Sequence, residues 1–218
     1  MKLNTQQVPV HPAIKNIIFD LGGVILNLDV DRTHKQFSRI SGKPIDQLKS
    51  EAGAMSFFSD YEQGTIEDRQ FRKELSDFLA VRVSDIEVDQ AWNAMLLDLP
   101  PIRIDLLKKV GSKFRIFLLS NTNNIHLQCF SEIVKTTTTL TSLDSLFERA
   151  YYSHLLKMRK PNEEIYQHVL QENQLKANET LFLDDNLANL SGALSIGIQT
   201  FHVKHPDLIF SLFDEKQP

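Results

Sequence analysis

The sequence predicts an α/β fold, in which a Rossmann-like core with a parallel β-sheet carries an inserted all-helical domain. Five short apolar runs rich in β-forming residues recur along the chain: Asn16–Phe19, Arg115–Leu119, Arg149–Tyr152, Thr180–Leu183 and Gln199–Val203. From the second run onward, they alternate with stretches whose apolar residues have helical spacing. This alternation is typical of right-handed βαβ units and hence of a parallel sheet.

The stretch between the first two runs is helical almost throughout and contains no convincing strand signal. Thr65–Asp68 begins one helix, and Ser84–Glu87 has the pattern of a capping box that opens another. Pro100-Pro101 then breaks the chain before the next helix. Later in the chain, Thr136–Thr139 suggests a flexible loop. We therefore predict a core domain of residues 14–30 and 100–218 and a helical domain of residues 31–99.

Composition excludes several classes of function. The 218 residues are 42% hydrophobic and 24% charged, as in an ordinary soluble globular protein. A net charge of -4 argues against a generic binder of nucleic acid or anionic membrane, because phosphate backbones select basic surfaces. The single cysteine, Cys129, and the polar start of residues 1–15 favour a cytoplasmic protein without a disulfide framework or signal peptide. No apolar run is long enough for a membrane span, and we expect a monomer or homodimer.

Polar residues follow the apolar runs where a parallel sheet would collect a ligand. Asp20 follows the first run, Ser120-Asn121 the second and Asp184-Asp185 the fourth, while Lys160 lies in a Lys-Pro segment before a helix. Each segment alone has a plain explanation as a turn or a helix cap. Their joint position at strand ends instead predicts one site of carboxylates, a hydroxyl, an amide and an ammonium group.

These segments resemble the four signature motifs of the haloacid dehalogenase superfamily. The resemblance covers Ile17 to about Val203 and rests on Phe-Asp-Leu-Gly-Gly-Val, Ser-Asn-Thr-Asn, Met-Arg-Lys-Pro and Phe-Leu-Asp-Asp-Asn. Within the superfamily, the motifs look most similar to bacterial α-glucose-1-phosphate phosphatases and to the phosphatase domain of soluble epoxide hydrolases. The resemblance implies hydrolysis of a small-molecule phosphate monoester, with a sugar phosphate as a candidate substrate. The insertion would form a helical cap over the site.

The resemblance also implies a magnesium site. A carboxylate that attacks a phosphate monoester needs a cation between the two negative groups, and Mg²⁺ prefers oxygen ligands. The implied ligands are the Asp20 carboxylate, the backbone carbonyl of Gly22 and the carboxylate of Asp185. Asp184 is expected to hold a metal-bound water or to orient Lys160. Which of the two adjacent aspartates binds directly stays open, with Asp185 favoured.

Further roles follow from the same resemblance. Asp20 would be the nucleophile that forms an aspartyl-phosphate. Lys160 would neutralise the charge of Asp20 and the phosphate, and Ser120 with Asn121 would hydrogen-bond the transferred phosphoryl group. Glu62 and Gln63 lie between two helices of the insertion, where related caps carry their specificity loop. A plain interhelical turn is the equal alternative for this segment.

One departure from the family pattern matters. Many phosphatases of the superfamily carry a general acid/base aspartate two residues after the nucleophile, where this chain has Gly22. Asp29 is a possible substitute, with helix capping as its more ordinary role, and substrates with good leaving groups would suit an enzyme without a proton donor. The alternatives are a non-catalytic binding protein and a dehalogenase or phosphonatase. A phosphonatase would need a Schiff-base lysine in the cap, for which the candidates are Lys35, Lys43, Lys49 and Lys73.

Overall fold

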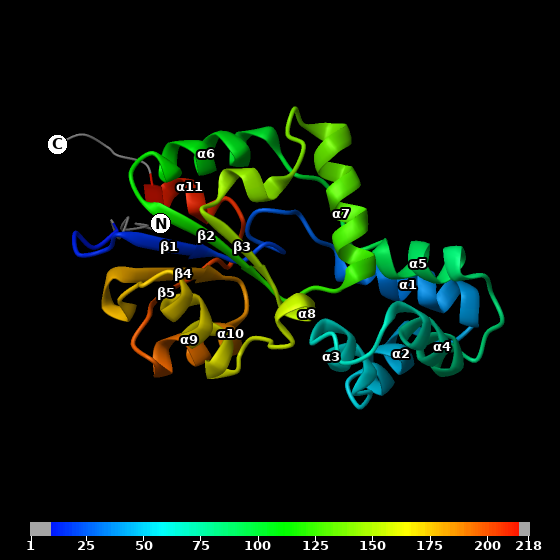
Figure 1. The fold of residues 1–218 in the computed structure, drawn as a ribbon. Coiled ribbons are helices and arrows are strands. Elements are labelled where there is room, and N and C mark those ends of the chain that lie inside the picture. The colour runs from blue at the N-terminus through cyan, green and yellow to red at the C-terminus, as the bar shows by residue number, and fades with distance from the viewer. Residues whose placement is uncertain (1–9, 214–218) are drawn as a thin grey trace, which may run out of the picture.

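The computed structural model describes residues 10–213, so that residues 1–9 of the polar start and residues 214–218 of the predicted core lie outside it. Its sheet has five parallel strands in the order β3-β2-β1-β4-β5 (Figure 1). The strands are β1 (Asn16–Phe19), β2 (Arg115–Ser120), β3 (Arg149–Tyr152), β4 (Thr180–Asp184) and β5 (Gln199–His202). All five lie where the sequence predicts them, with ends that differ by at most one residue.

Helices cover both faces of this sheet and complete a three-layered core. They are α6 (Pro101–Gly111), α7 (Asn124–Thr137), α8 (Ser153–Leu156), α9 (Glu163–Glu172), α10 (Leu187–Ser195) and α11 (Leu208–Phe213), with 3-10 turns at Leu143–Leu146 and Ala177–Glu179. Alternate strand residues face opposite layers. Ile17 and Phe19 pack with α6, α7 and α11, whereas Ile18 packs with α9 and α10. The β-strand period of the sequence thus becomes two separate apolar clusters.

The insertion is all-helical and has an apolar cluster of its own. Its helices are α1 (Val30–Ser41), α2 (Ile45–Ala52), α3 (Phe57–Glu62), α4 (Asp68–Leu79) and α5 (Asp85–Asn93). Aromatic rings of Phe57, Phe71 and Trp92 fill that cluster. The predicted capping box is confirmed, since Ser84 and Glu87 cap each other at the start of α5. A separate cluster supports the predicted division of the chain, whose exact boundaries stay a prediction.

One expectation about a loop is wrong. The threonine run from Thr136 to Thr139 does not form a loop throughout, because α7 continues to Thr137. The hydroxyl groups of Thr136 and Thr137 donate to the carbonyl oxygens four residues earlier, at 2.7 Å and 2.6 Å. Val134, one turn earlier, is buried in the core. Tertiary packing and these local bonds outweigh the weak helix propensity of threonine.

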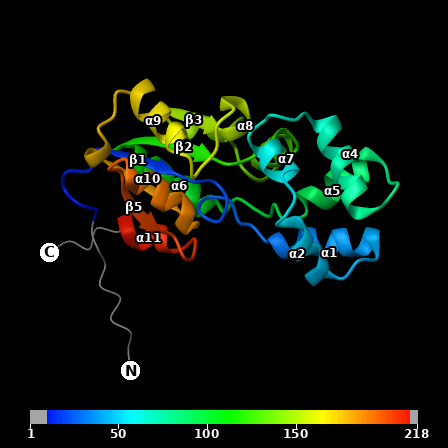
Figure 2. The ribbon, with the colours of Figure 1, turned by 90° about the horizontal axis from the view of Figure 1, so that it is seen from below.

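Two antiparallel connections join the cap to the core beside the carboxyl edge of the sheet (Figures 1 and 2). Leu28 and Leu96 form an isolated bridge between them, and the Asn27 side chain donates to Asp98 at 2.9 Å. Asp29 caps α1 by accepting from the Asp31 amide at 3.1 Å. It also lies 3.4 Å from Arg32, so its carboxylate stabilises the start of α1.

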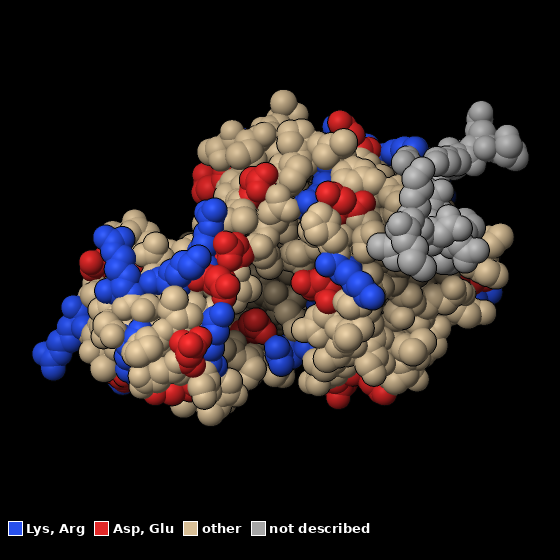
Figure 3. All heavy atoms as spheres, turned by 180° about the vertical axis from the view of Figure 1, so that it is seen from behind, with Lys and Arg blue, Asp and Glu red and all other residues tan. Residues whose placement is uncertain are grey.

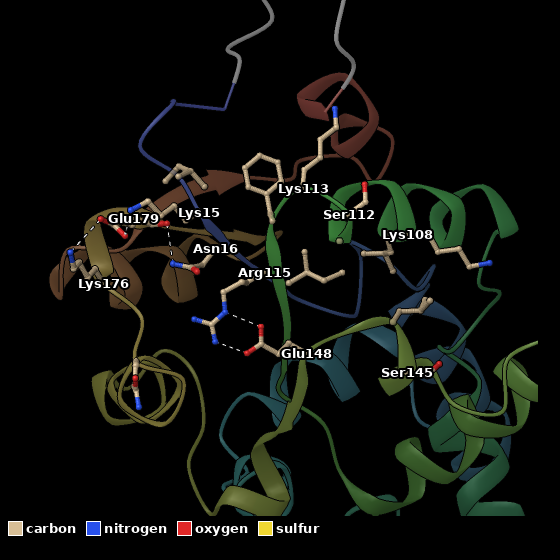
Figure 4. Close-up of a pocket in the computed structure, with 17 residues that line it drawn as sticks. Lys15, Asn16, Lys108, Ser112, Lys113, Arg115, Ser145, Glu148, Lys176 and Glu179 are labelled. Atoms are coloured by element: carbon tan, nitrogen blue, oxygen red, sulfur yellow. Dashed lines mark hydrogen bonds and ion pairs between the residues drawn. The ribbon is translucent and has the colours of Figure 1, made fainter.

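A cavity of about 870 Å³ lies at the opposite edge of the sheet, where the strands begin (Figure 4). Basic side chains surround it, but Arg115 pairs with Glu148, and Lys15 and Lys176 both pair with Glu179. The cavity is therefore remote from the strand ends that carry the predicted site.

Helix α7 belongs to both domains. Its first-turn residue Ile125 lies in the apolar cluster of the cap, whereas Phe130 lies in that of the core. The His126 ring stacks on Trp92 of α5, with centroids 4.6 Å apart, and its Nε2 lies 3.3 Å from the Trp92 carbonyl oxygen. Since that oxygen can only accept, Nε2 carries the proton, and Nδ1 accepts from Asn123 at 3.1 Å. Burial lowers the pKa of His126 to about 4.

Because of His126, we predict that the contact between the cap and the core is sensitive to acid. His126 takes up a proton near pH 6.5 in the unfolded chain but only near pH 4 in the folded chain. The contribution of the neutral ring to the free energy of unfolding is therefore complete above pH 6.5 and is lost as the pH falls toward 4. The loss should reach about 3 kcal/mol. His126→Gln keeps a donor and an acceptor but does not titrate. Urea unfolding between pH 4 and 7 gives the free energy of unfolding as a function of pH. The slope of that free energy against pH should be smaller in His126→Gln than in the wild type, by up to about 1.4 kcal/mol per pH unit. Equal slopes would contradict the assignment.

Candidate active site

The polar groups predicted at the strand ends converge around one buried ammonium group. Lys160 is 1% exposed, and its Nζ lies 2.6 Å from Asp20 Oδ1, 2.7 Å from Asp184 Oδ2 and 2.8 Å from the Leu119 carbonyl oxygen. An ammonium group has three hydrogens, and all three find acceptors here. β1 lies between β2 and β4, so the topology itself places Asp20 beside the ends of both neighbours.

The charges of these groups are strongly coupled. Burial alone would lower the pKa of Lys160, but the carboxylates of Asp20 and Asp184 outweigh it and raise the pKa, so the side chain stays an ammonium. Burial raises the pKa of Asp20 to about 7. The Lys160 ammonium opposes that rise, and the negative charges of Asp184 and Asp185 add to it. A single cation among three carboxylates leaves the site short of positive charge.

The two adjacent aspartates have different environments. Asp184 is fully buried and accepts from Lys160, from the Asn186 amide at 2.7 Å and from Asn189 Nδ2 at 3.0 and 3.1 Å. Asp185 is an exposed residue, and its carboxylate faces the cluster. Carboxylate oxygens of Asp20, Asp184 and Asp185 lie within 4.8 Å of one another. This donor set fits a hard divalent cation, and of the two adjacent aspartates Asp185 is the one whose carboxylate does not bind Lys160.

The glycine pair after Asp20 lets the chain pass close to these groups. Gly23 has φ +72, and a Cβ there would lie 2.5 Å from Asp185 Oδ2. A Cβ at Gly22 would lie 2.5 Å from Leu28 Cδ1. The sequence analysis named Gly22 but missed Gly23, although the Gly-Gly doublet was a visible signal for a close approach of the backbone.

Ser120 and Asn121 differ in what remains available to a ligand. The Ser120 hydroxyl makes one long contact, 3.4 Å to the Asn121 carbonyl oxygen. Asn121 instead uses both polar atoms of its side chain on the main chain of Lys160. Its Oδ1 accepts from the Lys160 amide at 2.9 Å, and its Nδ2 donates to the Lys160 carbonyl oxygen at 2.9 Å. The Asn121 side chain therefore fixes the position of the Lys160 main chain, and its contact with a phosphoryl group stays a prediction.

Glu62 and Gln63 lie at the seam between cap and core. Glu62 pairs with Arg159 at 2.7 Å, and Gln63 donates to the Lys157 carbonyl oxygen at 3.2 Å. Both side chains therefore bind the segment that leads to Lys160, and they bring the cap onto the core. Figure 3 shows the molecular surface hollowed between the two lobes, with charged side chains at the border of the hollow.

Three residues that the sequence analysis missed support the site from behind. Asn189 donates to both oxygens of Asp184 and thereby orients the carboxylate that holds Lys160. Tyr166 donates to the Asn189 carbonyl oxygen at 2.7 Å. A Cβ at Gly192 would lie 2.1 Å from the Pro161 carbonyl oxygen, so only glycine lets α10 approach the lysine segment this closely. Asn189 and Gly192 follow Asp184 in the chain and lie three residues apart, on one face of α10. That spacing was the available signal in the sequence.

Comparison with known proteins agrees with this geometry. A model of haloacid dehalogenase-like hydrolases matches residues 14–197. A D-ribitol-5-phosphate phosphatase of Bacteroides thetaiotaomicron is 28% identical over 190 residues, which is 86% of this chain and 91% of that protein. No described helix is both long and apolar enough to cross a bilayer.

Solved structures give the same result. A haloacid dehalogenase family enzyme of Bacteroides thetaiotaomicron has a TM-score of 0.80 and 35% identity, over 87% of this chain and 93% of that one. The same enzyme was also solved with magnesium and inorganic phosphate, at a TM-score of 0.76 and 34% identity, with the same shares covered. A predicted HAD-like family hydrolase from Porphyromonas gingivalis has a TM-score of 0.76 and 30% identity, over 87% of this chain and 91% of that one. The chain belongs to the haloacid dehalogenase-like hydrolase family.

Proposed function

We propose that this protein is a magnesium-dependent phosphatase that hydrolyses a phosphate monoester of a small sugar or polyol. The observation that carries the proposal is the buried Lys160 ammonium between Asp20 and Asp184, with Asp185 facing the same point. The related D-ribitol-5-phosphate phosphatase and the relative solved with magnesium and phosphate support the substrate class and the cofactor. A cytoplasmic monomer or homodimer is part of the same proposal.

The proposed reaction has two steps. A carboxylate oxygen of Asp20 attacks phosphorus, the ester P–O bond breaks, and the alcohol leaves with a proton from solvent. Water then attacks phosphorus, the bond to Asp20 breaks, and inorganic phosphate leaves. Lys160 neutralises the charges of Asp20 and of the phosphate, and the Ser120 hydroxyl donates to a phosphoryl oxygen. Magnesium, held by Asp20, the Gly22 carbonyl and Asp185, would supply the positive charge that lets two anions meet.

The other activities considered for this chain have less support. A dehalogenase of this family needs no metal, and the Asp185 carboxylate beside Asp20 and Asp184 would then be hard to rationalise. A phosphonatase needs a cap lysine with a lowered pKa. Lys49 and Lys73 pair with carboxylates on the cap surface, and hydrogen bonds to those carboxylates raise their pKa. Lys43 pairs with Glu51 at 3.1 Å.

The first prediction of the proposed function tests the nucleophile. Asp20→Asn keeps the shape of the side chain and should still fold, but turnover should fall by at least about a thousandfold, because an amide cannot form the covalent intermediate. Excess chelator should have the same effect on the wild type, reversed by added Mg²⁺. A screen of sugar and polyol phosphates measures both. Hydrolysis by Asp20→Asn at the wild-type rate would overturn the mechanism.

The second prediction separates the adjacent aspartates. Asp185→Asn should weaken the apparent Mg²⁺ affinity by at least about tenfold, because the variant loses a direct ligand. Burial and the charge of Asp184 raise the pKa of Asp185, so removing its charge should leave the metal-free stability unchanged or higher. Asp184→Asn should instead lower the unfolding free energy by about 3 kcal/mol, since Lys160 loses a buried partner. Magnesium titration and urea unfolding of both variants decide the ranking.

The third prediction concerns the proton donor. D-Ribitol 5-phosphate is an ester of a primary alcohol, a poor leaving group, whereas an anomeric phosphate leaves easily. Without a donor at Gly22 or Asp29, kcat/KM of the wild type should favour α-glucose 1-phosphate. The double variant Gly22→Asp/Leu28→Ala makes room for the new side chain and should narrow that preference by roughly 10²-fold. Leu28→Ala alone is the control. A preference that the double variant leaves unchanged from the Leu28→Ala control would contradict a missing donor at Gly22.

A further inference from the structure

The first turn of α7 lies between the cap and the loop that carries Ser120. Residues 123–126 follow directly on Ser120–Thr122, and Asn123, Ile125 and His126 are all buried. Trp92 of α5 contacts this turn from one side, by stacking on His126 and by donating to Asn123 Oδ1 at 3.4 Å. The cap therefore holds this turn, although the turn follows β2 of the core in the chain.

A second set of contacts holds the turn from the side of α3 and α4. The Tyr61 hydroxyl accepts from the Ile125 amide at 3.2 Å and donates to Asp68 Oδ1 at 2.8 Å. The other oxygen of Asp68 accepts from Asn124 Nδ2 at 2.8 Å. Burial and the hydrogen bond to Asp68 raise the pKa of Tyr61, which keeps it a donor. The Asp68 carboxylate thus joins α3 to α7, with one oxygen bonded to Tyr61 and the other to Asn124.

A third contact joins the same loop to the cap through a buried hydroxyl. Ser153 is fully buried, and its Oγ accepts from the Thr122 amide at 2.9 Å. The same Oγ lies 2.5 Å from the carbonyl oxygen of Glu62 in the cap and 3.0 Å from that of Thr122. A single hydroxyl proton serves both carbonyls. The position of Thr122, two residues after Ser120, therefore depends on where the cap lies.

We propose that the cap positions the phosphoryl-binding loop through the first turn of α7, and that Asp68 and Asn124 are positioning residues for Ser120. The proposal rests on the proposed function of the Ser120 hydroxyl as a phosphoryl ligand. Neither Asp68 nor Asn124 touches the reacting atoms. They act by fixing the start of α7, whose displacement would carry Ser120 away from the phosphoryl oxygen. Displacements of about 1 Å at such a group cost roughly a hundredfold in rate.

Inorganic phosphate is the probe, because it has no leaving group that the cap could contact. In Asp68→Asn, the new amide still accepts from Tyr61, but its contact with Asn124 loses the charge and keeps a hydrogen bond only if the Asn124 amide is reversed. The inhibition constant of phosphate against turnover should rise about tenfold, with the apparent Mg²⁺ affinity measured without phosphate unchanged within about twofold. The exchanged pair Asp68→Asn/Asn124→Asp reverses donor and acceptor, keeps the net charge and should restore phosphate binding to within about threefold of the wild type.

Asp89→Asn is the matched control. Asp89 is also a cap carboxylate, paired with Arg72 at 2.8 Å, but its partner lies within the cap, so phosphate inhibition should stay at the wild-type value. Asn124→Ala removes the same contact from the core side and gives the answer if Asp68→Asn does not fold. Wild-type phosphate inhibition in both Asp68→Asn and Asn124→Ala would overturn the proposal. So would an exchanged pair that regains the wild-type melting temperature but not phosphate binding. A wild type that neither binds phosphate nor hydrolyses any ester would instead refute the proposed function.

Discussion

The buried contact of Lys160 with Asp20 and Asp184 is the constraint on which the rest of the site depends. An ammonium group without water is costly unless acceptors surround it, and three acceptors do so here. Each acceptor comes from a different strand or strand end, so the ion pairs form only when β1, β2 and β4 are in register. Asn121 and Asn189 fix the lysine main chain and the Asp184 carboxylate. The energetic requirement of one charge thus organises the whole carboxyl edge of the sheet.

The cap adds a second constraint, because it is more than a domain on two linkers. Its own apolar cluster takes in Ile125 of α7, and its loop at Glu62 and Gln63 binds the segment that carries Lys160. The hinge between Leu28 and Leu96 is therefore not the sole junction with the core among the residues that the structure describes. These junctions surround the catalytic edge, so a shift of the cap reaches both the lysine segment and the Ser120 loop.

Much of this arrangement is predictable from the sequence. Apolar runs with strand composition located the five strands, and the polar residues after them located Asp20, Ser120 and Asp184. The sequence could not assign a direction to a side chain. Asn121 follows a strand like a ligand-binding amide, yet it faces the Lys160 main chain, because those backbone groups are its nearest partners. Gly192 and Ile125 act through contacts distant in sequence, which no local pattern records. The finer resemblance to glucose-1-phosphate phosphatases stays a prediction.

The position of β1 in the sheet has a consequence for how the chain folds. This first strand is the central one, and its neighbours begin at Arg115 and Thr180. During synthesis, β1 leaves the ribosome long before β2 and β4 have been made. Its backbone therefore has no strand to pair with while the insertion emerges. Closing loops of that length is slow, and exposed strand edges invite aggregation. The helices of the insertion need only each other for most of their apolar cluster. The region that later covers the carboxyl edge of the sheet can therefore become compact first, and Asp20 reaches its final surroundings only after Asp184 has been made.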